Sequence, residues 1–331
     1  MKLVEITDRT QWDSYVGSHP WGHPLQLWGW GETKRENAWV PYRLALVDGE
    51  RWVGAVQVVL WRLPRLNYWI VYAPRGPVAE PGGSIAKLTC ELLVEWASRN
   101  NGLYVRIDPS WREGAPRGWV KAKHSLQMAE TYVIDLRADE PALLEPMSRK
   151  HRQYIRKAER DGITVVRSAV PATSDEIDVM FSIYNDTATR AGFGIHSRKY
   201  YEQLAREFGE NSHLYFALYE ERPVAFLWLV TAGVTAYELY GGVTETGQDF
   251  KANYFLKWEA MRTMKRLGLE RYDFNGRVTE GVAKFKEGFG PEEVDYIGAY
   301  DYPLNRLGYR LWEGLWPVAK RVGRAVRGRK A

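Results

Sequence analysis

Alternating apolar and polar positions predict two β-hairpins with the same layout. The first, YRLALVDGERWVGAVQVVL from Tyr42, contains an apolar strand, a charged turn at residues 48–51 and a second apolar strand. The second, HLYFALYEERPVAFLWLV from His213, repeats this arrangement, with residues 217–218 in the place of residues 45–46. The repetition predicts that the chain arose by an internal duplication.

The elements that follow each hairpin also repeat. A third strand ends in glycine, and a helix with apolar residues at helical spacing comes next, at about 84–99 in one copy and 252–267 in the other. A further strand then ends at an acidic residue, Asp108 in YVRIDP and Asp273 in RYDFNG. This order is similar to that of the GNAT acyltransferase core. We therefore predict an α/β (α+β) protein with two tandem GNAT-like domains, each a mixed central sheet flanked by helices.

A break in the pattern separates the two copies. After Leu136-Arg-Ala-Asp-Glu-Pro141, the segment MSRKHRQYIRKAERDGITV indicates a basic helix that ends at Gly162 and a strand that opens the second copy. A later strand, EEVDYIGAYDYPL, leads to a final helix that we expect to return to the first domain. The predicted division is residues 1–138 plus about 298–331 for the first domain and 139–297 for the second.

Composition limits the class of protein and the chemistry. With 331 residues, 45% of them hydrophobic and 26% charged, the chain suits two globular domains. Its single cysteine, Cys90, excludes a disulfide framework and a cysteine-based zinc site, and the six histidines show no metal-binding spacing, so no metal or other cofactor is expected. No secretion signal or run of about 18 apolar residues occurs, and we expect a cytoplasmic protein.

Positive charge gathers in two segments, residues 149–160 and 320–330, within a net charge of +5. Such segments suit polyanionic partners, although a charged run is more often a solvated face. For the tail from Leu304 we expect a packed helix to Trp316, followed by a basic end. Contact of this tail with tRNA phosphates or with anionic lipid is the alternative.

One segment contains candidate catalytic residues. AKFKEGFGP, residues 283–291, has two lysines one residue apart and then a Gly-Phe-Gly turn, which could present a cation to negative charge that develops in acyl transfer. From these residues alone, a polar loop with solvated lysines is favoured. The basic Gly-rich loop that holds the pyrophosphate of CoA is missing at residues 80–84 and 245–252, which makes CoA an unfavoured donor.

The sequence resembles the FemABX family of peptidoglycan bridge aminoacyltransferases, without the coiled-coil insertion of some members. The resemblance covers about residues 20–300. It is carried, in order, by QLWGWGETK from Gln26, RIDP from Arg106, the basic segment from Met147, DTATRAGFGIHSRKYYEQL from Asp186, YELYGG from Tyr237, ANYFLKWEAMRTMKRLGL from Ala252, RYDFNG from Arg271 and FKEGF from Phe285.

The resemblance implies an aminoacyltransferase of class EC 2.3.2.-. Its donor would be aminoacyl-tRNA, and its acceptor the stem-peptide amine of UDP-MurNAc-pentapeptide or lipid II. The first domain would bind the acceptor precursor, and the second would hold the catalytic lysine loop and face the tRNA. A monomer is expected, with peripheral contact with the inner membrane surface.

The resemblance also assigns residues to roles. Lys286, with Lys284 as the less favoured neighbour, would stabilise the tetrahedral oxyanion of aminolysis. The chemistry, rather than the resemblance, makes Asp108 the candidate acceptor of the amine proton, provided that the fold brings it within hydrogen-bond reach of the amine; capping of a turn is the alternative. Lys34 and Arg198 would clamp the diphosphate of the acceptor, with Arg190 as a rival to Arg198.

Three tyrosines are further candidates for substrate contact: Tyr201, Tyr237 and Tyr240. Core packing is the alternative for the last two.

Two other functions remain open on the sequence alone. The same fold would suit an N-acyltransferase that uses acyl-CoA, or a transferase that acts on a polysaccharide or a protein. A non-catalytic module that binds tRNA through the basic helix and tail is an alternative of a different class.

Overall fold

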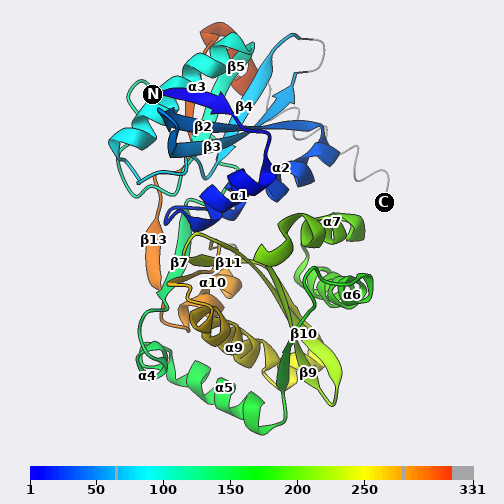
Figure 1. Cartoon of the computed structure of the whole chain (residues 1–331). Coiled ribbons are helices and arrows are strands. Elements are labelled where there is room, and N and C mark those ends of the chain that lie inside the picture. The colour runs from blue at the N-terminus through cyan, green and yellow to red at the C-terminus, as the bar shows by residue number, and fades with distance from the viewer. Residues whose placement is uncertain (64–65, 278–279, 315–331) are drawn as a thin grey trace.

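Two mixed sheets form the framework of the protein (Figure 1). The computed structural model describes residues 1–63, 66–277 and 280–314. Within these residues the first sheet has seven strands in the spatial order β1 (Lys2–Glu5), β2 (Trp39–Asp48), β3 (Arg51–Arg62), β4 (Trp69–Pro74), β5 (Gly102–Asp108), β14 (Tyr300–Pro303) and β6 (Val120–Lys121). The second has seven in the order β13 (Glu292–Asp295), β7 (Glu130–Asp135), β12 (Arg271–Asp273), β11 (Thr235–Val243), β10 (Arg222–Ala232), β9 (Ser212–Tyr219) and β8 (Thr164–Arg167).

The duplication predicted from the hairpins is confirmed by the strand pairing. The β2–β3 and β9–β10 hairpins are antiparallel, and each continues through an antiparallel third strand to a parallel pair, β4–β5 or β11–β12. Both parallel pairs end at an acidic residue, because Pro74 pairs with Asp108 and Tyr237 with Asp273. The α+β fold with two mixed sheets is therefore confirmed.

The helices cover the sheets as their apolar spacing requires. In the first domain α3 (Ser84–Arg99) buries Ala86, Cys90, Leu93 and Ala97 against the sheet. The other helices are α1 (Arg9–Ser18), α2 (Trp28–Lys34), α4 (Glu140–Leu144), α5 (Arg149–Arg160), α6 (Ser174–Ala191), α7 (Arg198–Phe208), α8 (Glu245–Asp249), α9 (Ala252–Arg266) and α10 (Glu280–Glu287), with short 3-10 helices at Pro24–Gln26, Arg35–Asn37 and Gly209–Asn211.

A shared hydrophobic core joins the two domains. It contains Trp12, Val16 and Leu27 of the first domain together with Tyr200 and Trp228 of the second. Figure 1 shows α1 and α2 lying against α7 at this junction. The approach of α2 to α7 is close: a Cβ added at Gly29 would lie 2.2 Å from the carbonyl oxygen of Glu207. The domains are thus packed together over apolar surface, which favours one fixed arrangement.

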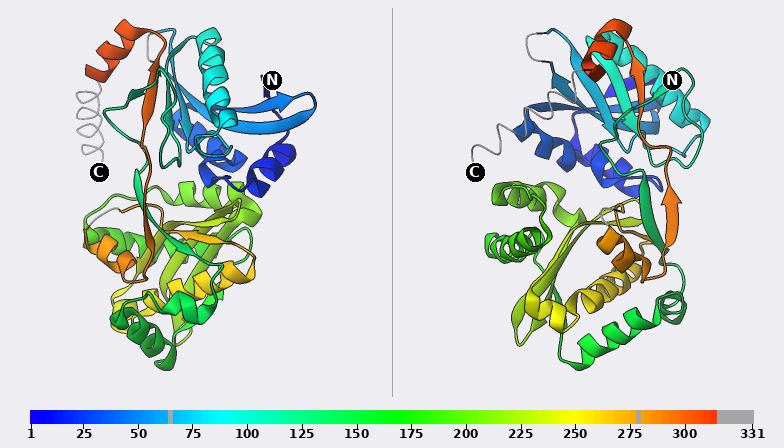
Figure 2. Two further views of the ribbon diagram at one scale, coloured as in Figure 1. Left: turned by 90° about the vertical axis from the view of Figure 1, so that its left-hand side faces the viewer. Right: turned by 180° about the vertical axis from the view of Figure 1, so that it is seen from behind.

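Strand pairing divides the chain differently from the predicted boundary near residue 139. Strand β7 lies before that position, yet it pairs with β12 and β13 of the second sheet. Strand β14, in contrast, belongs to the first sheet, where it lies between β5 and β6. We therefore propose a division between β6 and β7, with the chain returning to the first domain between β13 and β14. Figure 2 shows the two connecting segments side by side at the junction.

Candidate functional site

A cavity of about 460 Å³ lies between the two domains. The first domain contributes His23, Arg75 and Trp111 to its lining, and the second contributes Tyr237, Arg271, Asp273 and Tyr296. A cavity of this size suits a small-molecule or peptide ligand. It lies where the parallel strand pairs end, the position at which α/β sheets commonly bind their ligands.

Asp273 is the carboxylate that β12 presents to this cavity. Its Oδ1 accepts hydrogen bonds from Thr131 Oγ1 at 2.5 Å and from the backbone N–H of Asn275 at 2.7 Å. Its Oδ2 has no hydrogen-bond partner among the described residues. Burial raises the pKa of this carboxyl, and the hydrogen bond from Thr131 acts in the opposite direction. Asp273 thus offers one oxygen that is free to accept a proton or to bind an ammonium group.

Asp108 occupies the equivalent position in the first sheet, but both of its oxygens are engaged. Oδ2 accepts from the hydroxyl of Tyr72 at 2.6 Å, and Oδ1 accepts from the backbone N–H of Arg75 at 3.0 Å. The carboxyl is 1% exposed and is not among the residues that line the cavity. A general-base role for Asp108 remains a prediction. In the structure, the Asp108 carboxylate fixes Arg75 by accepting a hydrogen bond from its backbone N–H.

Arg75 was not singled out from the sequence, although it lines the cavity. Its backbone has φ +55°, which is uncommon for a residue with a side chain, and Asp108 holds it in place. The guanidinium donates to the carbonyl of Met128 at 2.6 Å and lies 5.0 Å from the ring centre of Tyr296. It therefore connects the first domain to the segment that enters the second.

Lys286 lies behind the strand end that carries Asp273. It is 5% exposed and, like Asp108, is not among the residues that line the cavity. Its ammonium donates to the carbonyls of Phe274 at 2.8 Å and Gly276 at 2.7 Å. Burial lowers the pKa of this lysine, while Glu238 and Asp273 act to raise it. An ammonium has three N–H donors, so one remains after these two bonds. Lys284, by comparison, is exposed and pairs with Glu280 at 2.7 Å.

A charge pair between Glu238 and Lys257 lies close to Lys286, and it too was not singled out from the sequence. Glu238 of β11 accepts from the ammonium of Lys257 on α9 and, at 2.9 Å, from the hydroxyl of Tyr272. Burial lowers the pKa of Lys257, and the charge of Lys286 acts in the same direction. Nothing in the local sequence marks this pair, because its members come from a strand and a helix that meet only in the fold.

Lys34, at the end of α2, lies among aromatic rings between the two domains. Its ammonium is 3.5 Å from the hydroxyl of Tyr200, 4.9 Å from the ring centre of Trp30 and 5.5 Å from that of Tyr200. The ring of His196 stacks on Tyr200 with 4.1 Å between centroids. No carboxylate pairs with Lys34 among the residues that the structure describes, so its charge is available to an anion.

Arg198 is directed toward α6. It forms ion pairs with Asp178 and, at 3.1 Å, with Glu202.

The three predicted tyrosines differ in how deeply they are buried. Tyr201 is fully buried, and its hydroxyl accepts a hydrogen bond from the backbone N–H of His196. Tyr240 packs on Tyr201 with 5.2 Å between ring centroids, whereas Tyr237 lines the cavity. Lys34 and Tyr200 are thus brought together, and Tyr237 is brought to Asp273.

Arg190, the rival to Arg198, donates to the carbonyl of Val243, at the end of β11. It is therefore engaged with the second sheet. Its role as a phosphate ligand is not supported by any contact with Lys34.

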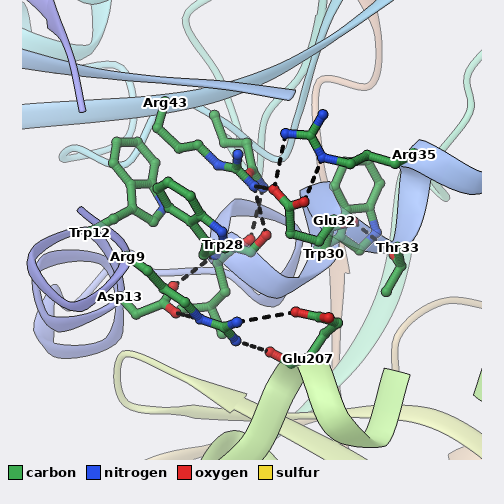
Figure 3. Close-up of polar contacts among 12 residues, drawn as sticks. Arg9, Trp12, Asp13, Trp28, Trp30, Glu32, Thr33, Arg35, Arg43 and Glu207 are labelled. Atoms are coloured by element: carbon green, nitrogen blue, oxygen red, sulfur yellow. Dashed lines mark hydrogen bonds and ion pairs between the residues drawn. The ribbon is translucent and has the colours of Figure 1, made fainter. Parts of the chain in front are cut away.

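The aromatic segment around Trp28 holds α2 in position (Figure 3). The guanidinium of Arg43 lies 3.8 Å from the ring centre of Trp28 and donates at 2.8 Å to Glu32, while Asp13 accepts from the backbone N–H of Trp28. Gln26, just before α2, donates to the carbonyl of Pro74 at 2.6 Å. This segment thereby fixes both Lys34 and the strand end that leads into Arg75.

Comparisons with known proteins agree with this architecture. Residues 7–116 match the FemAB family, and residues 147–287 match a family described as acetyltransferase (GNAT) domain. The chain is 23% identical to lipid II:glycine glycyltransferase of Staphylococcus saprophyticus and also 23% identical to that of Staphylococcus aureus, with 96% of each chain covered in both cases. The alignment with the former spans 405 positions, so that relative contains segments that are absent here.

Two solved structures are similar to the whole or most of the fold. The crystal structure of FemX has a TM-score of 0.85 at 21% identity and covers 95% of this chain and 100% of its own. The C-terminal domain of a putative lysylphosphatidylglycerol synthetase from Agrobacterium fabrum has a TM-score of 0.52 at 13% identity, over 78% of this chain and 84% of its own. These likenesses show a fold of two GNAT-like domains.

Proposed function

We propose that this chain, which belongs to the FemABX family and is an acyltransferase, moves an amino acid from aminoacyl-tRNA to the stem-peptide amine of a peptidoglycan precursor. The observation that carries the proposal is the cavity between the domains, with the free oxygen of Asp273 on one side and the buried ammonium of Lys286 behind the same strand end. The first domain binds the acceptor, and the second faces the donor.

The reaction needs few groups because the donor ester is already activated. The amine nitrogen attacks the ester carbonyl and forms the new C–N bond, and its proton passes to Oδ2 of Asp273. The remaining N–H of Lys286 stabilises the oxyanion that forms on the carbonyl oxygen. Collapse of this intermediate breaks the ester C–O bond, and the ribose oxygen leaves with the proton that Asp273 took from the amine, which returns Asp273 to its ionised form. Positioning of the two substrates by the cavity supplies much of the rate.

The acceptor diphosphate is proposed to bind at Lys34, flanked by Trp30 and Tyr200. Because one charge-assisted hydrogen bond contributes about 1.5–3 kcal/mol, Lys34→Met should raise the acceptor KM by roughly 10- to 100-fold with little change in kcat. Lys199→Met is the matched control, since Lys199 is an exposed neighbour on α7 that pairs with Glu36. Initial rates against UDP-MurNAc-pentapeptide would measure both constants.

Arg198→Met tests the predicted clamp. An unchanged acceptor KM agrees with the ion pairs that Arg198 forms with Asp178 of α6 and with Glu202 of its own helix. A rise equal to that of Lys34→Met would mean that Arg198 leaves Asp178 when the acceptor binds. A change in kcat without a change in KM for Lys34→Met would contradict the diphosphate site.

Transfer of labelled amino acids from a mixed pool of charged tRNA to UDP-MurNAc-pentapeptide and to lipid II tests the function itself. We expect a product with at least one acceptor, and this product should vanish after treatment with RNase. A product from acyl-CoA without tRNA would instead establish the N-acyltransferase alternative. RNA binding without any product would establish the non-catalytic module.

We also propose that the protein is a monomer on the cytoplasmic side of the membrane and touches the membrane peripherally when its acceptor is lipid-linked. Among the described residues, none of the helices has the length and apolar character needed to span a bilayer. Likewise, no cluster of three or more potential metal ligands occurs in the described part of the chain.

A further inference from the structure

The helix at residues 306–314 turns Tyr309, Trp312 and Glu313 inward and its two leucines outward. Glu313 is 6% exposed and lies 3.5 Å from the guanidinium of Arg106. That guanidinium forms two 2.7 Å hydrogen bonds with Asp301, which also accepts from the hydroxyl of Tyr309 at 2.8 Å. The sequence predicted a packed helix from Leu304 to Trp316, and within the described residues Tyr309 and Trp312 do pack against the first sheet. The rest of that prediction, with the basic end at residues 320–330, lies outside the residues that the structure describes. The buried ion pairs fix this face of the helix inward and leave Leu307 and Leu311 toward solvent.

The outer face of the helix is apolar. Leu307 is 70% exposed and Leu311 is 59% exposed, and their spacing of four residues places them on one side of the helix. Adjacent exposed leucines on one side of a helix form an apolar patch, and contiguous apolar patches mark interaction sites more often than single exposed residues do. Figure 2 shows the helix at the end of the first sheet that is remote from the second domain.

The neighbouring β3–β4 hairpin packs beside the helix and carries a further exposed leucine. Leu66 at its tip is 56% exposed. The hairpin contacts the helix through a hydrogen bond of 3.2 Å between Asn305 and Tyr68, and through Trp61, whose ring lies 5.8 Å from that of Trp312. We name Leu66, Leu307 and Leu311 together the leucine surface.

Unpaired positive charge accompanies the leucine surface. Arg62, Arg306 and Arg310 are exposed, and among the described residues none of them forms an ion pair. Nearby Arg99, in contrast, pairs with Glu95 at 3.3 Å. Guanidinium groups next to exposed apolar side chains match an anionic bilayer, where the arginines meet lipid phosphates and the leucines enter the interface.

We propose that the leucine surface, with its three arginines, docks the protein on an anionic lipid bilayer. RNA would use the arginines but would gain nothing from the leucines, so the combination favours lipid. Because the Arg106–Asp301–Glu313 contacts already fix the helix, docking needs no prior folding step. Docking would bring the enzyme to a lipid-linked acceptor, and this role rests on the proposed function. Vesicle binding itself can be measured without any acceptor.

The test is flotation of the full-length protein with vesicles of phosphatidylglycerol and phosphatidylcholine, and with vesicles of phosphatidylcholine alone. We expect the unchanged protein to bind the anionic vesicles, and to bind them less as salt is added. Binding by the double variant Leu307→Asp/Leu311→Asp should be at least tenfold weaker. Arg306→Gln/Arg310→Gln should also weaken it and should reduce its salt dependence. The matched control is Leu267→Asp, which changes a 51% exposed leucine of the second domain and should bind as the unchanged protein does.

Several outcomes would overturn the proposal. Undiminished binding of the double leucine variant would assign vesicle binding to another segment, such as the basic end of the chain. An equal loss of tRNA binding in that variant would indicate an RNA surface, and a dimer that dissociates only in that variant would indicate a second copy of the chain. Transfer to soluble UDP-MurNAc-pentapeptide should be unchanged in both double variants. If vesicles bind as expected but no transfer occurs in the unchanged protein, the proposed function fails and the docking surface stands.

Discussion

Replacing Lys286 with methionine is expected to lower kcat for amino acid transfer by a factor of about 10²–10³, the usual cost of removing one oxyanion donor. Methionine has a similar volume, so the buried site stays filled while the charge and its third N–H are lost. The KM for the acceptor should change little, because the acceptor diphosphate is proposed to bind at Lys34. Steady-state rates at saturating donor would measure the effect.

The control for this variant is Lys284→Met, which removes an exposed lysine two residues away that pairs with Glu280. Lys286→Met leaves two carbonyls without their donor, so its thermal unfolding must be compared with that of the unchanged protein. A folded variant with a kcat within threefold of the unchanged protein would contradict the catalytic role of Lys286. A larger effect of Lys284→Met would transfer that role to the neighbour.

The second large effect is expected at Asp273. Asp273→Asn should lower kcat by about 10²–10⁴-fold, the range typical of a lost general base. The ionised carboxylate is the active form, and burial raises its pKa above the usual value of about 3.9. Activity of the unchanged protein should therefore be present above this raised pKa and be lost as the pH falls through it. The Asn variant should lack this acidic limb of the pH–rate profile.

Asp108→Asn provides the matched comparison, because Asp108 is the counterpart of Asp273 in the duplicated fold. Both of its oxygens accept hydrogen bonds within the protein, so its replacement should mainly loosen Arg75 and raise KM. A loss of kcat in Asp108→Asn that exceeds the loss in Asp273→Asn, with disappearance of the acidic limb, would restore Asp108 as the base and exclude Asp273.

The parts of the fold that could be predicted from sequence are those with a local pattern. The hairpins were visible because strands alternate with a period of two and because each hairpin has its turn within a few residues. Strand β7 pairs across the predicted boundary, with a partner, β12, that lies far along the chain. No local pattern encodes such a pairing, and only the completed second sheet places β7.

The candidate site shows the same limit. Lys286 and Lys34 could be named because each lies in a short motif, whereas Arg75 has no motif of its own and reaches the cavity through a contact with Asp108. Arg198 lies in a motif but is directed by Asp178 of another helix. Asp273 was visible as the counterpart of Asp108. Its free oxygen was not, since that depends on where Thr131 and Asn275 place their donors.

The position of β14 has a consequence for how the chain is made. This strand lies between β5 and β6 of the first sheet, although it follows the whole second domain in the sequence. During synthesis, β5 and β6 leave the ribosome long before the strand that separates them. The domain that is translated first can complete its sheet only after the domain translated second has emerged. A ribosome stalled before residue 300 should therefore hold a nascent first domain with an unpaired strand edge, open to chaperones or to proteolysis.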